Sequence, residues 1–469
     1  MARIPAFSAL SVAALLAAAP AIAAPEGADP SLVEKGRYLA TAGDCTSCHN
    51  NPKTGNPFSG GYGVGSPIGM IYGPNITPSA KTGIGSWTLD EFSNAVRKGR
   101  GRGGHYLYPA MPYTAFSGIS DADTRALYSY FMLGVPAAEN EAPKTELAFP
   151  FNIRPLMMGW DLLFGASGGK PAAQAPESGV ARGKYLVDTL AHCSTCHTPR
   201  GMLMEEKTGS FLAGAQLGQW KAPNITSDPV SGIGKWSEDD LFRYLKTGYV
   251  DGKGVAAGEM GLAVQNSFSK LTDGDIRSIA AYIKTVPPVN TGAKEPRSGW
   301  SKSAPLPVDK LESPLEQKDY KAFITVSNMS GAQIYEGACA TCHGYDGRGT
   351  PDRVMPSLVG SSAVGSADPA NLVMTITDGV SRTVHGNHVL MPVFKTKLNT
   401  SEIAKVADYV ATAFGDPSHR VTEGDVQRVY GGGREVSWLI ANAAALTWAG
   451  LAVVVMAIIG LFVAWRRKA

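Results

Sequence analysis

The chain has 469 residues, a nearly balanced formal charge of +3, 54 glycines and 31 prolines. A chain of this length exceeds what one hydrophobic core usually organises, so several domains are expected. The balanced charge gives no indication of a nucleic-acid partner, and the abundance of glycine and proline indicates that much of the chain is loop.

The chain opens with a segment typical of a secretory signal peptide. Arg3 supplies a positive charge, residues 9–20 are apolar, and Ala21-Ile22-Ala23 is an A-x-A cleavage site. We therefore expect residues 1–23 to direct export from the cytoplasm and then to be removed.

Cys45-Thr-Ser-Cys48-His49 is the first of three C-x-x-C-H motifs, which together use all six cysteines of the chain. This motif is the attachment site of c-type haem. Its two thiols form thioethers with the porphyrin, and the adjacent imidazole binds the iron on the proximal side. The sequence therefore predicts three covalently bound haem c groups. The predicted attachment residues are Cys45, Cys48, Cys193, Cys196, Cys339 and Cys342, and the predicted proximal ligands are His49, His197 and His343.

Other uses of paired cysteines explain this pattern less well. Disulfides are common in exported proteins, and a C-x-x-C pair also forms thioredoxin-like redox sites. Neither use explains a histidine directly after every second cysteine. A zinc site would need a second pair of ligands, and no other cysteine is present to supply it.

The first two motifs lie in a duplicated unit. Pro74-Asn-Ile-Thr77 returns as Pro223-Asn-Ile-Thr226, and Gly83-Ile-Gly-Ser-Trp87 returns as Gly232-Ile-Gly-Lys-Trp236. A short amphipathic helix with a shared Gly-x-Tyr-Leu phrase is expected before each of these two motifs. The third unit lacks the two longer phrases, and its Pro356–Gly360 loop is typical of a compact single-haem domain.

A capped helix is expected at the end of each unit. The cap is followed three residues later by an acid, which is the spacing of a capping box. A tyrosine lies ten residues after each cap, and we interpret these tyrosines as packing residues rather than catalytic groups. The caps are Ser120, Thr272 and Asn399, the acids are Asp123, Asp275 and Glu402, and the tyrosines are Tyr130, Tyr282 and Tyr409.

The segment between the first two units is rich in proline and alanine but contains an apolar run, Phe149–Phe164. So apolar a run is not expected to lie free in water. Packing against the haem domains, docking of a partner subunit and contact with a membrane surface all stay open for it.

Residues 438–465 carry no charge, whereas about 20 apolar residues are enough to span a bilayer. Tryptophans lie near both ends of this stretch, and Arg466-Arg467-Lys468 follow it directly. By the positive-inside rule, the C-terminus should lie in the cytoplasm. The haem domains are then expected on the periplasmic side of the bacterial inner membrane.

The expected fold is mainly α, with three cytochrome c-type haem domains in tandem and one C-terminal transmembrane helix. The expected boundaries are a signal peptide at 1–23, a first domain at 24–135, a linker at 136–177, a second domain at 178–288, a linker at 289–327, a third domain at 328–415, a polar tail at 416–435, a transmembrane helix at 436–465 and a cytoplasmic tail at 466–469.

A methionine precedes the capped helix of each unit and is placed to bind the distal side of the iron. The predicted distal ligands are Met111, Met260 and Met391. A thioether is a soft, neutral ligand, and His/Met haems have raised potentials. Three histidines in the same loops stay open as alternative ligands: His105, His385 and His388. His385 and His388 are the rivals of Met391.

Together these features resemble the triheme cytochrome c subunit of membrane-bound bacterial dehydrogenases of the acetic-acid-bacteria type. Those enzymes oxidise alcohols, aldehydes, gluconate, sorbitol or fructose. The resemblance rests on the order and spacing of the three haem motifs, on Tyr108-Pro-Ala-Met-Pro-Tyr113 and on the Pro-Asn-Ile-Thr phrases. It spans nearly the whole mature chain, and it implies that the chain passes electrons from a catalytic subunit to ubiquinone in the membrane.

The resemblance also implies partners. The catalytic subunit would carry flavin, molybdenum or pyrroloquinoline quinone, and a small third subunit is a further candidate. No acid–base pair or nucleophile stands out in this chain, so we assign substrate oxidation to the catalytic subunit. The alternative function is that of a c-type subunit of a terminal oxidase, or of an electron donor to one.

Overall fold

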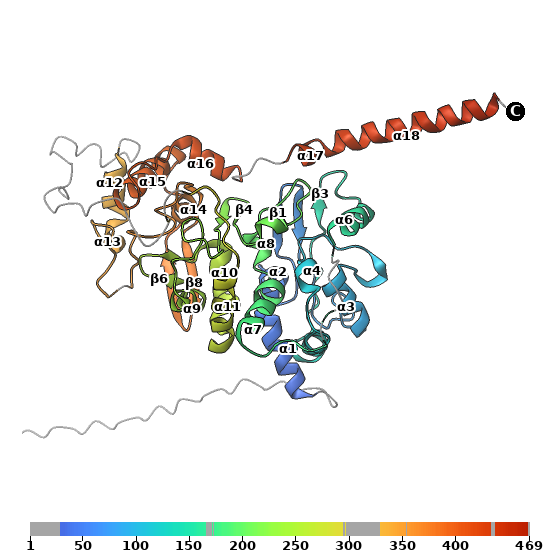
Figure 1. Ribbon diagram of the computed structural model, residues 1–469, viewed down its shortest axis with the longest axis horizontal. Coiled ribbons are helices and arrows are strands. Elements are labelled where there is room, and N and C mark those ends of the chain that lie inside the picture. The colour runs from blue at the N-terminus through green and yellow to red at the C-terminus, as the bar shows by residue number, and fades with distance from the viewer. Residues whose placement is uncertain are drawn as a thin grey trace, which may run out of the picture.

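The computed structural model of the chain describes residues 29–165, 171, 173–293, 296, 329–352, 354–432 and 437–467. Three mainly helical units follow one another in these ranges, and a long apolar helix ends them (Figure 1). The predicted signal peptide at 1–23 and most of the predicted linker at 289–327 lie outside the described residues.

The first two units repeat one arrangement of elements. An N-terminal helix leads into a short helix that carries the C-x-x-C-H motif, a small hairpin follows, and a helix packed on the first one ends the unit. The first unit contains α1 (Pro30–Ala42), α2 (Cys45–His49), β1 (Gly63–Ser66), β2 (Gly69–Tyr72), α3 (Leu89–Lys98), α4 (Tyr113–Phe116) and α5 (Asp121–Ser129). The second contains α7 (Gly179–Tyr185), α8 (Ser194–His197), β4 (Ala215–Leu217), β5 (Trp220–Ala222), α9 (Glu238–Thr247), β6 (Tyr249–Val250), β7 (Gly254–Val255), α10 (Gly258–Asn266) and α11 (Asp273–Thr285).

The third unit has its own core and extends further than the sequence indicated. Its last helix lies within residues 416–435, which we expected to form a polar tail. Val426 and Val429 of this helix are fully buried in the third core, so the folded unit reaches at least Tyr430. It contains α12 (Gly331–Ala338), α13 (Ala340–His343), α14 (Ala370–Asp378), β8 (Val380–Val384), β9 (Asn387–Met391), α15 (Thr400–Phe414) and α16 (Glu423–Tyr430).

A glycine in the first helix of each unit lets the closing helix approach closely. A Cβ atom on Gly36 would lie 2.0 Å from the carbonyl oxygen of Ala126, and one on Gly183 would lie 1.8 Å from that of Ser278. Gly331 repeats this contact with α15 in the third unit. The predicted packing tyrosines lie beside these crossings; they are Tyr130, Tyr282 and Tyr409.

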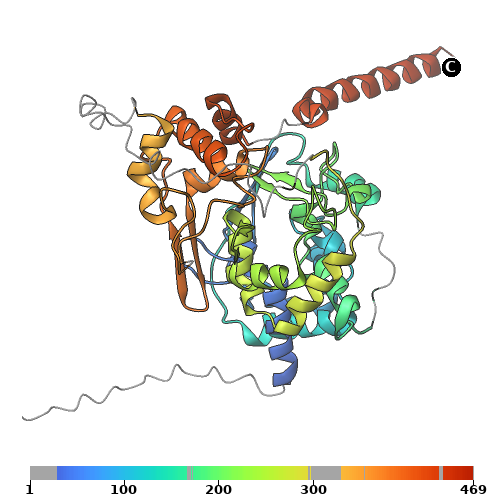
Figure 2. The same cartoon turned by 60° about the vertical axis from the view of Figure 1, so that its left-hand side comes forward.

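The first two units share one hydrophobic core, whereas the third has its own. Leu39 and Ala42 of α1, and Leu186 directly after α7, are almost completely buried in the shared core. Figures 1 and 2 accordingly show α1, α7 and α11 side by side. The duplicated units therefore form one body rather than two independent domains.

Two tyrosines cross between these units in a reciprocal exchange. Tyr38 of α1 donates to Asp275 of α11 (2.7 Å), and Tyr185 of α7 donates to Asp123 of α5 (2.8 Å). Because Tyr38 and Tyr185 occupy the same place in the repeated phrase, the exchange is isologous, like that of a two-fold dimer. Each hydroxyl also accepts a backbone N–H, from Thr272 (3.1 Å) and Ser120 (3.2 Å) respectively.

The acids of this exchange also pair with basic residues. Arg182 donates to both carboxylate oxygens of Asp275 (2.9 and 2.8 Å), and Lys35 lies 2.7 Å from Asp123. Burial raises the pKa of Asp275, but the hydrogen bonds from Arg182 and Tyr38 outweigh this effect, and the pKa is lowered overall. The carboxylate of Asp275 is therefore ionised at neutral pH and held by both units.

These contacts change what the sequence predicted for the helix caps. The hydroxyls of Ser120 and Thr272 cap α5 and α11 as expected. Asp123 and Asp275 do not complete the capping boxes, because their side chains bond to the tyrosine of the other unit. Among the three closing helices only α15 has a complete box, from Asn399 and Glu402.

The third unit contacts the second through a β-hairpin. Strands β8 and β9 are joined by His385 and Gly386, which both have positive φ, as two-residue hairpin turns require. Arg382 of β8 is buried and donates to the carbonyl oxygen of Ala256 (2.7 Å). Both views show this hairpin beside α10 (Figures 1 and 2).

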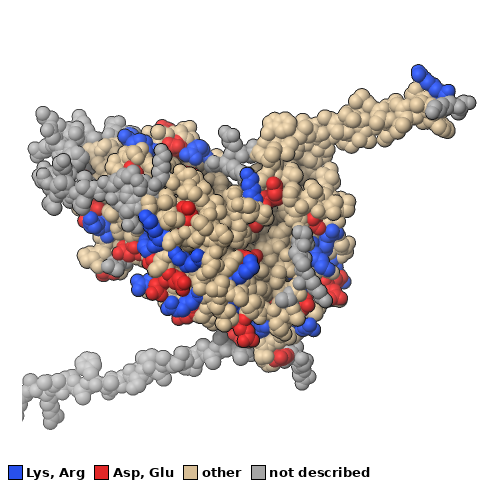
Figure 3. All heavy atoms as spheres, viewed as in Figure 1, with Lys and Arg blue, Asp and Glu red and all other residues tan. Residues whose placement is uncertain are grey.

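The connector and the C-terminal helix complete the described chain. The connector contains β3 (Glu146–Leu147), which pairs with β2, and α6 (Met157–Phe164). The C-terminal span consists of α17 (Trp438–Ala441) and α18 (Ala443–Arg466). Helix α18 is long and apolar enough to cross a membrane, and it projects from the body without a buried residue (Figure 3).

Replacing Tyr38 and Tyr185 by Phe removes every hydrogen bond that these two hydroxyls make between the units and leaves the rings in place. A hydrogen bond to a charged group contributes about 1.5–3 kcal/mol, so the double variant should unfold at lower guanidinium concentration than the wild type. Circular dichroism measures this transition. Tyr345→Phe changes an exposed ring and should leave the midpoint unchanged. Equal midpoints for the double variant and the wild type would contradict a role of the exchange in joining the units.

Candidate haem sites

In each unit a proline carbonyl holds the ring of the motif histidine. Metal-bound histidines commonly donate their second ring N–H to such an acceptor, which fixes the tautomer and the ring plane. The bond uses Nδ1, so Nε2 is the nitrogen with which these histidines would bind iron as the predicted proximal ligands. The Nδ1 atoms of His49, His197 and His343 lie 2.8, 2.7 and 3.0 Å from the carbonyl oxygens of Pro74, Pro223 and Pro356.

The repeated Pro-Asn-Ile-Thr phrase builds this acceptor in the first two units. The Asn75 side chain accepts from the N–H and the hydroxyl of Thr77 (2.9 and 2.7 Å), and Asn224 does the same with Thr226. The resulting tight turn presents the preceding proline carbonyl to the histidine. Sequence reasoning found the phrase but missed its role, because the bond joins residues 25 or 26 positions apart.

The third unit reaches the same contact through a shorter loop. Pro356 follows His343 by only 13 positions. The loop turns at glycines with positive φ, among them Gly344 and Gly349, a conformation that glycine adopts without steric cost. A Cβ atom on Gly349 would also lie 2.2 Å from the carbonyl oxygen of Met355. This loop is the compact one that the sequence indicated.

Burial sets the protonation of the motif histidines. It lowers the pKa of His49 and of His343, although the hydrogen bonds to the proline carbonyls act in the opposite direction. Both rings are therefore neutral at neutral pH. Neutral imidazole is the form that binds a metal.

The motif cysteines lack the features of disulfide or thioredoxin-like sites. None of the six forms a disulfide. Burial raises the pKa of Cys45 and of Cys193 to about 12, so both are thiols at neutral pH, whereas redox exchange uses thiolates. The described residues also contain no cluster of three or more His, Cys, Asp or Glu side chains suited to a metal ion.

The first two motifs open into one continuous cavity of about 2150 Å³. Ligand pockets usually measure about 300–1,000 Å³, so this cavity has room for two large ligands. The repeated Gly-Ile-Gly-x-Trp phrase supplies part of its apolar wall, through Ile84 and Trp87 and their counterparts Ile233 and Trp236. The motif residues that line it are Cys45, Cys48, His49, Cys193, Cys196 and His197.

Met111 and Met260 line the same cavity and pack against the shared core. Each methionine therefore faces the space that the histidine of its unit also lines, as the distal-ligand prediction needs. His105 lines the cavity as well, but it is exposed and its Nδ1 lies 2.8 Å from the carbonyl oxygen of Arg102. Packing thus favours Met111 over His105.

Met391 ends β9 and packs with Cys339 against the third core. The two rival histidines bond elsewhere. Nε2 of His385 lies 3.1 Å from the carbonyl oxygen of Ser269 in the second unit, and Nε2 of His388 lies 3.3 Å from the hydroxyl of Ser381. These contacts favour Met391 as the distal residue of the third site.

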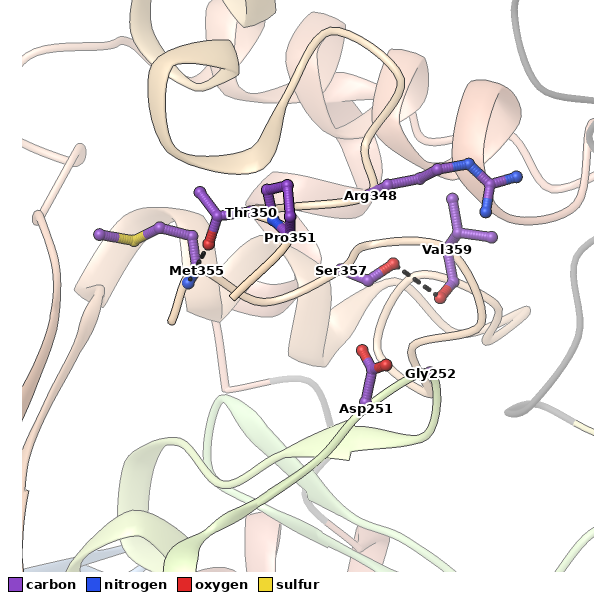
Figure 4. Close-up of a pocket in the computed structure, with 8 residues that line it drawn as sticks. All are labelled: Asp251, Gly252, Arg348, Thr350, Pro351, Met355, Ser357 and Val359. Carbon is purple, nitrogen blue, oxygen red and sulfur yellow. Dashed lines mark hydrogen bonds between the residues drawn. The ribbon is translucent and has the colours of Figure 1, made fainter. Parts of the chain in front are cut away.

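A smaller cavity of about 350 Å³ lies where the second and third units meet (Figure 4). The turn at Asp251 and Gly252 lines one side. A loop of the third unit lines the other, through Arg348, Thr350, Pro351, Met355, Ser357 and Val359. Hydrogen bonds within that loop hold its shape, as the dashed lines in Figure 4 show. No Cys or His lines this cavity, so we interpret it as a junction between units and not as a haem pocket.

The residues present fit haem c at all three motifs. Each motif offers two cysteines outside any disulfide, an oriented histidine, and a methionine that shares its cavity or core. When bound, haem c supplies a carrier of single electrons.

Comparisons with known proteins agree with this reading of the site. The family model "Cytochrome c" matches residues 33–133 and 180–287, and the model "Cytochrome C oxidase, cbb3-type, subunit III" matches residues 327–410. The chain is 40% identical over 423 residues to the fructose dehydrogenase cytochrome subunit of Gluconobacter japonicus, with 88% of this chain and 85% of that relative covered.

Two further relatives match at 37% identity. One is the cytochrome c subunit of alcohol dehydrogenase (quinone) of Komagataeibacter europaeus, over 448 residues, 92% of this chain and 91% of that one. The other is the gluconate 2-dehydrogenase cytochrome c subunit of Pantoea cypripedii, over 410 residues, 84% of this chain and 88% of that one. The chain belongs to the family of dehydrogenase cytochrome c subunits.

Membership in this family confirms the resemblance seen in the sequence. It also confirms a mainly helical fold with cytochrome c domains, and it makes the chain a cytochrome c electron-transfer subunit with a catalytic dehydrogenase subunit as partner. The match to the oxidase subunit is confined to the third unit.

Replacing Cys339 and Cys342 by Ala should remove one haem and leave the other two, because the third motif lies in a separate core. A pyridine haemochrome assay per mole of chain should fall from three haems to two. The same change at Cys193 and Cys196 should also disturb the first site, since these motifs share a cavity. Fewer than three haems per wild-type chain would overturn the predicted count.

Met391→Leu keeps the side-chain volume and removes the thioether. We expect the methionine-to-iron charge-transfer band of the oxidised protein to lose intensity, by the amount that the third site contributes. Met374→Leu is the matched control, because Met374 is a buried methionine of the same core, and its band should be unchanged. An intact band in Met391→Leu would contradict Met391 as the ligand, and a loss of the six-coordinate low-spin spectrum of one haem in His388→Ala would instead assign the ligand to His388.

Proposed function

We propose that this chain carries three covalently attached haem c groups and passes electrons from a catalytic dehydrogenase subunit to ubiquinone in the membrane. The observation that carries this proposal is the contact between a motif histidine and a proline carbonyl, which recurs in all three units of one chain. It is the contact that an iron-binding imidazole needs, and each copy comes with its own pair of cysteines.

The partner is a dehydrogenase that oxidises alcohols, aldehydes, sugars or sugar acids. The relatives belong to fructose, alcohol and gluconate dehydrogenases, and this range supports a substrate with a hydroxyl group. Oxidation takes place in the catalytic subunit, on flavin, molybdenum or pyrroloquinoline quinone, and a small third subunit is a further candidate partner. The cytochrome chain then needs a surface for that subunit and a path to the membrane.

Helix α10 links the three sites within the chain. It carries Met260, and the Asn266 side chain at its end donates to the hydroxyl of Ser47 in the first motif (2.9 Å). Gln265 of the same helix accepts the backbone N–H of Thr383 (2.6 Å), in the hairpin that ends at Met391. One helix therefore fixes the second distal residue and touches the elements of the other two sites, which supports electron transfer within the chain.

The haem cavity reaches the start of the C-terminal helix. Leu439, Ile440 and Leu446 belong to its lining, together with the motif residues. An apolar passage from lipid towards the haem cavity suits ubiquinone, whose tail is apolar. This extension of the cavity supports a quinone as the acceptor.

The same helix supports the proposed location. Helix α18 spans the bacterial inner membrane, and Arg466 at its end and Arg467 after it lie on the cytoplasmic side. The haem units then lie in the periplasm, where the N-terminal signal peptide directs them. Covalent attachment of haem c outside the cytoplasm agrees with this placement.

The terminal-oxidase alternative has narrower support. The oxidase subunit model matches residues 327–410 only, whereas the dehydrogenase subunits match 84–92% of the chain. The first two units, with their shared core and cavity, lie outside the oxidase match. We therefore favour the dehydrogenase role.

Purification of the chain with its catalytic subunit tests this role. The complex should reduce a soluble ubiquinone analogue when substrate is added, and the catalytic subunit alone should reduce only an artificial dye. The Cys339→Ala/Cys342→Ala variant should keep dye reduction and lose most quinone reduction. Quinone reduction by the catalytic subunit alone, or direct oxygen reduction with a copper–haem partner, would overturn the proposal.

A further inference from the structure

The connector turns an apolar helix face towards solvent. Leu162 and Leu163 of α6 are 85% and 69% exposed, and Met158 is 58% exposed. The single charged residue of the helix, Asp161, is turned inward, and Arg100 lies 3.2 Å from its carboxylate. A surface helix normally places its apolar face on the core and its charges in water. Helix α6 is reversed in this respect.

Contacts on the inner side hold α6 in this orientation. The ring of Trp160 packs edge-on against Tyr113 of the first unit, with centroids 6.4 Å apart. Its Nε1 donates to the carbonyl oxygen of Leu203 in the second unit (2.9 Å). The outward face is therefore fixed by both haem units, and its exposure does not come from a loose connector.

Side chains of the second unit extend the exposed apolar surface. Met202 and Leu203, in the loop that accepts the Trp160 bond, are 56% and 42% exposed. The exposed side chains of the two segments form what we call the apolar patch. It consists of Leu156, Met158, Leu162, Leu163, Met202 and Leu203.

The apolar patch continues into the first turns of the C-terminal helix. The hydroxyl of Ser437, directly before α17, donates to the carbonyl oxygen of Met202 (2.9 Å). Phe149 of the connector stacks on Trp448 of α18, with ring centroids 5.4 Å apart and planes inclined by 24°. Both views show α6 close to the start of this helix (Figures 1 and 2).

We propose that the apolar patch is immersed in the outer leaflet of the bilayer, so that α6 lies in the membrane interface beside α18. Tryptophans mark the headgroup level of a membrane span, and Trp438 and Trp448 are both exposed at this end of the helix. Phe149 shares the level of Trp448, and α6 follows from the same connector. A protein partner on the patch would have to enter the headgroup region, which lipid already fills.

This immersion gives the haem cavity a defined position. Leu163 of the patch and Leu446 of α18 both line the cavity. With both side chains in lipid, the cavity mouth faces the acyl chains instead of the periplasm. The inference rests on the membrane insertion of α18, which is part of the proposed function. Immersion of the patch adds a second point of attachment to the membrane, and two points of attachment fix the tilt of the haem units.

Photo-crosslinking of the full-length holoprotein tests the immersion directly. The protein is reconstituted in vesicles that contain phosphatidylcholine with a diazirine on the acyl chain, and adducts are mapped by peptide mass spectrometry. We expect adducts on the α6 peptide and on α18, and none on α5, which exposes the charged Arg125 to water. Adducts on α18 alone would overturn the inference and leave the membrane helix standing. Adducts on neither helix would overturn both.

Substitutions and the partner subunit complete the test. Leu162→Asp should abolish the α6 adducts and leave those on α18 and the haem content unchanged, because Leu162 is 85% exposed and does not line the haem cavity. Val354→Asp is the matched control, because Val354 is also an exposed aliphatic residue (69%) but lies in the third unit, and it should change nothing. If addition of the catalytic subunit removes the α6 adducts, the patch is a docking surface for that subunit and the inference is wrong.

Discussion

The hydrogen bond from a motif histidine to a proline carbonyl is the constraint around which each unit is organised. A histidine that binds iron must present one ring nitrogen in a fixed plane, and the protein fixes that plane by a hydrogen bond to the other ring nitrogen. In the duplicated units an Asn–Thr turn builds the acceptor, and in the third unit a glycine-rich loop does so. The loops differ in length and sequence, but each delivers a carbonyl oxygen to Nδ1. Burial then keeps His49 and His343 neutral.

Duplication explains why the first two sites share one cavity. Tyr38 and Tyr185 occupy the same place in the repeat, so each can reach the closing helix of the other unit. The third unit has Gln333 at the equivalent place, two residues after the helix glycine, and its Tyr335 donates to the carbonyl oxygen of Gly344 in its own unit (2.6 Å). The third unit therefore keeps a separate core and joins the pair through its hairpin. Two motifs that line one apolar cavity and a third in the adjoining unit suit the proposed transfer of electrons within the chain.

In the proposed arrangement, one side of the body faces the membrane. The apolar patch, the open end of the haem cavity and the first turns of α18 all lie together, held by the contacts of Ser437 and Phe149. On the face drawn in Figure 3, charged side chains are scattered over the body, whereas α18 carries charge only at its far end. An electron carrier that delivers to a lipid-soluble acceptor gains from this arrangement, because the acceptor stays in lipid and the haem sites remain in the folded units.

The sequence by itself determined the local features of this protein. The haem motifs, the duplication, the capped closing helices and the C-terminal apolar helix were all readable, because each depends on residues close together in the chain. The tertiary structure decided the rest: the role of the Pro-Asn-Ile-Thr phrase, the turning of Asp123 and Asp275 away from their caps, the burial of α16 and the outward face of α6. Each of these depends on a partner far away in the sequence or on which face of a helix meets the core. A short motif does not predict such contacts, because the same acidic side chain can cap its own helix or bind a tyrosine that comes near only when the chain folds.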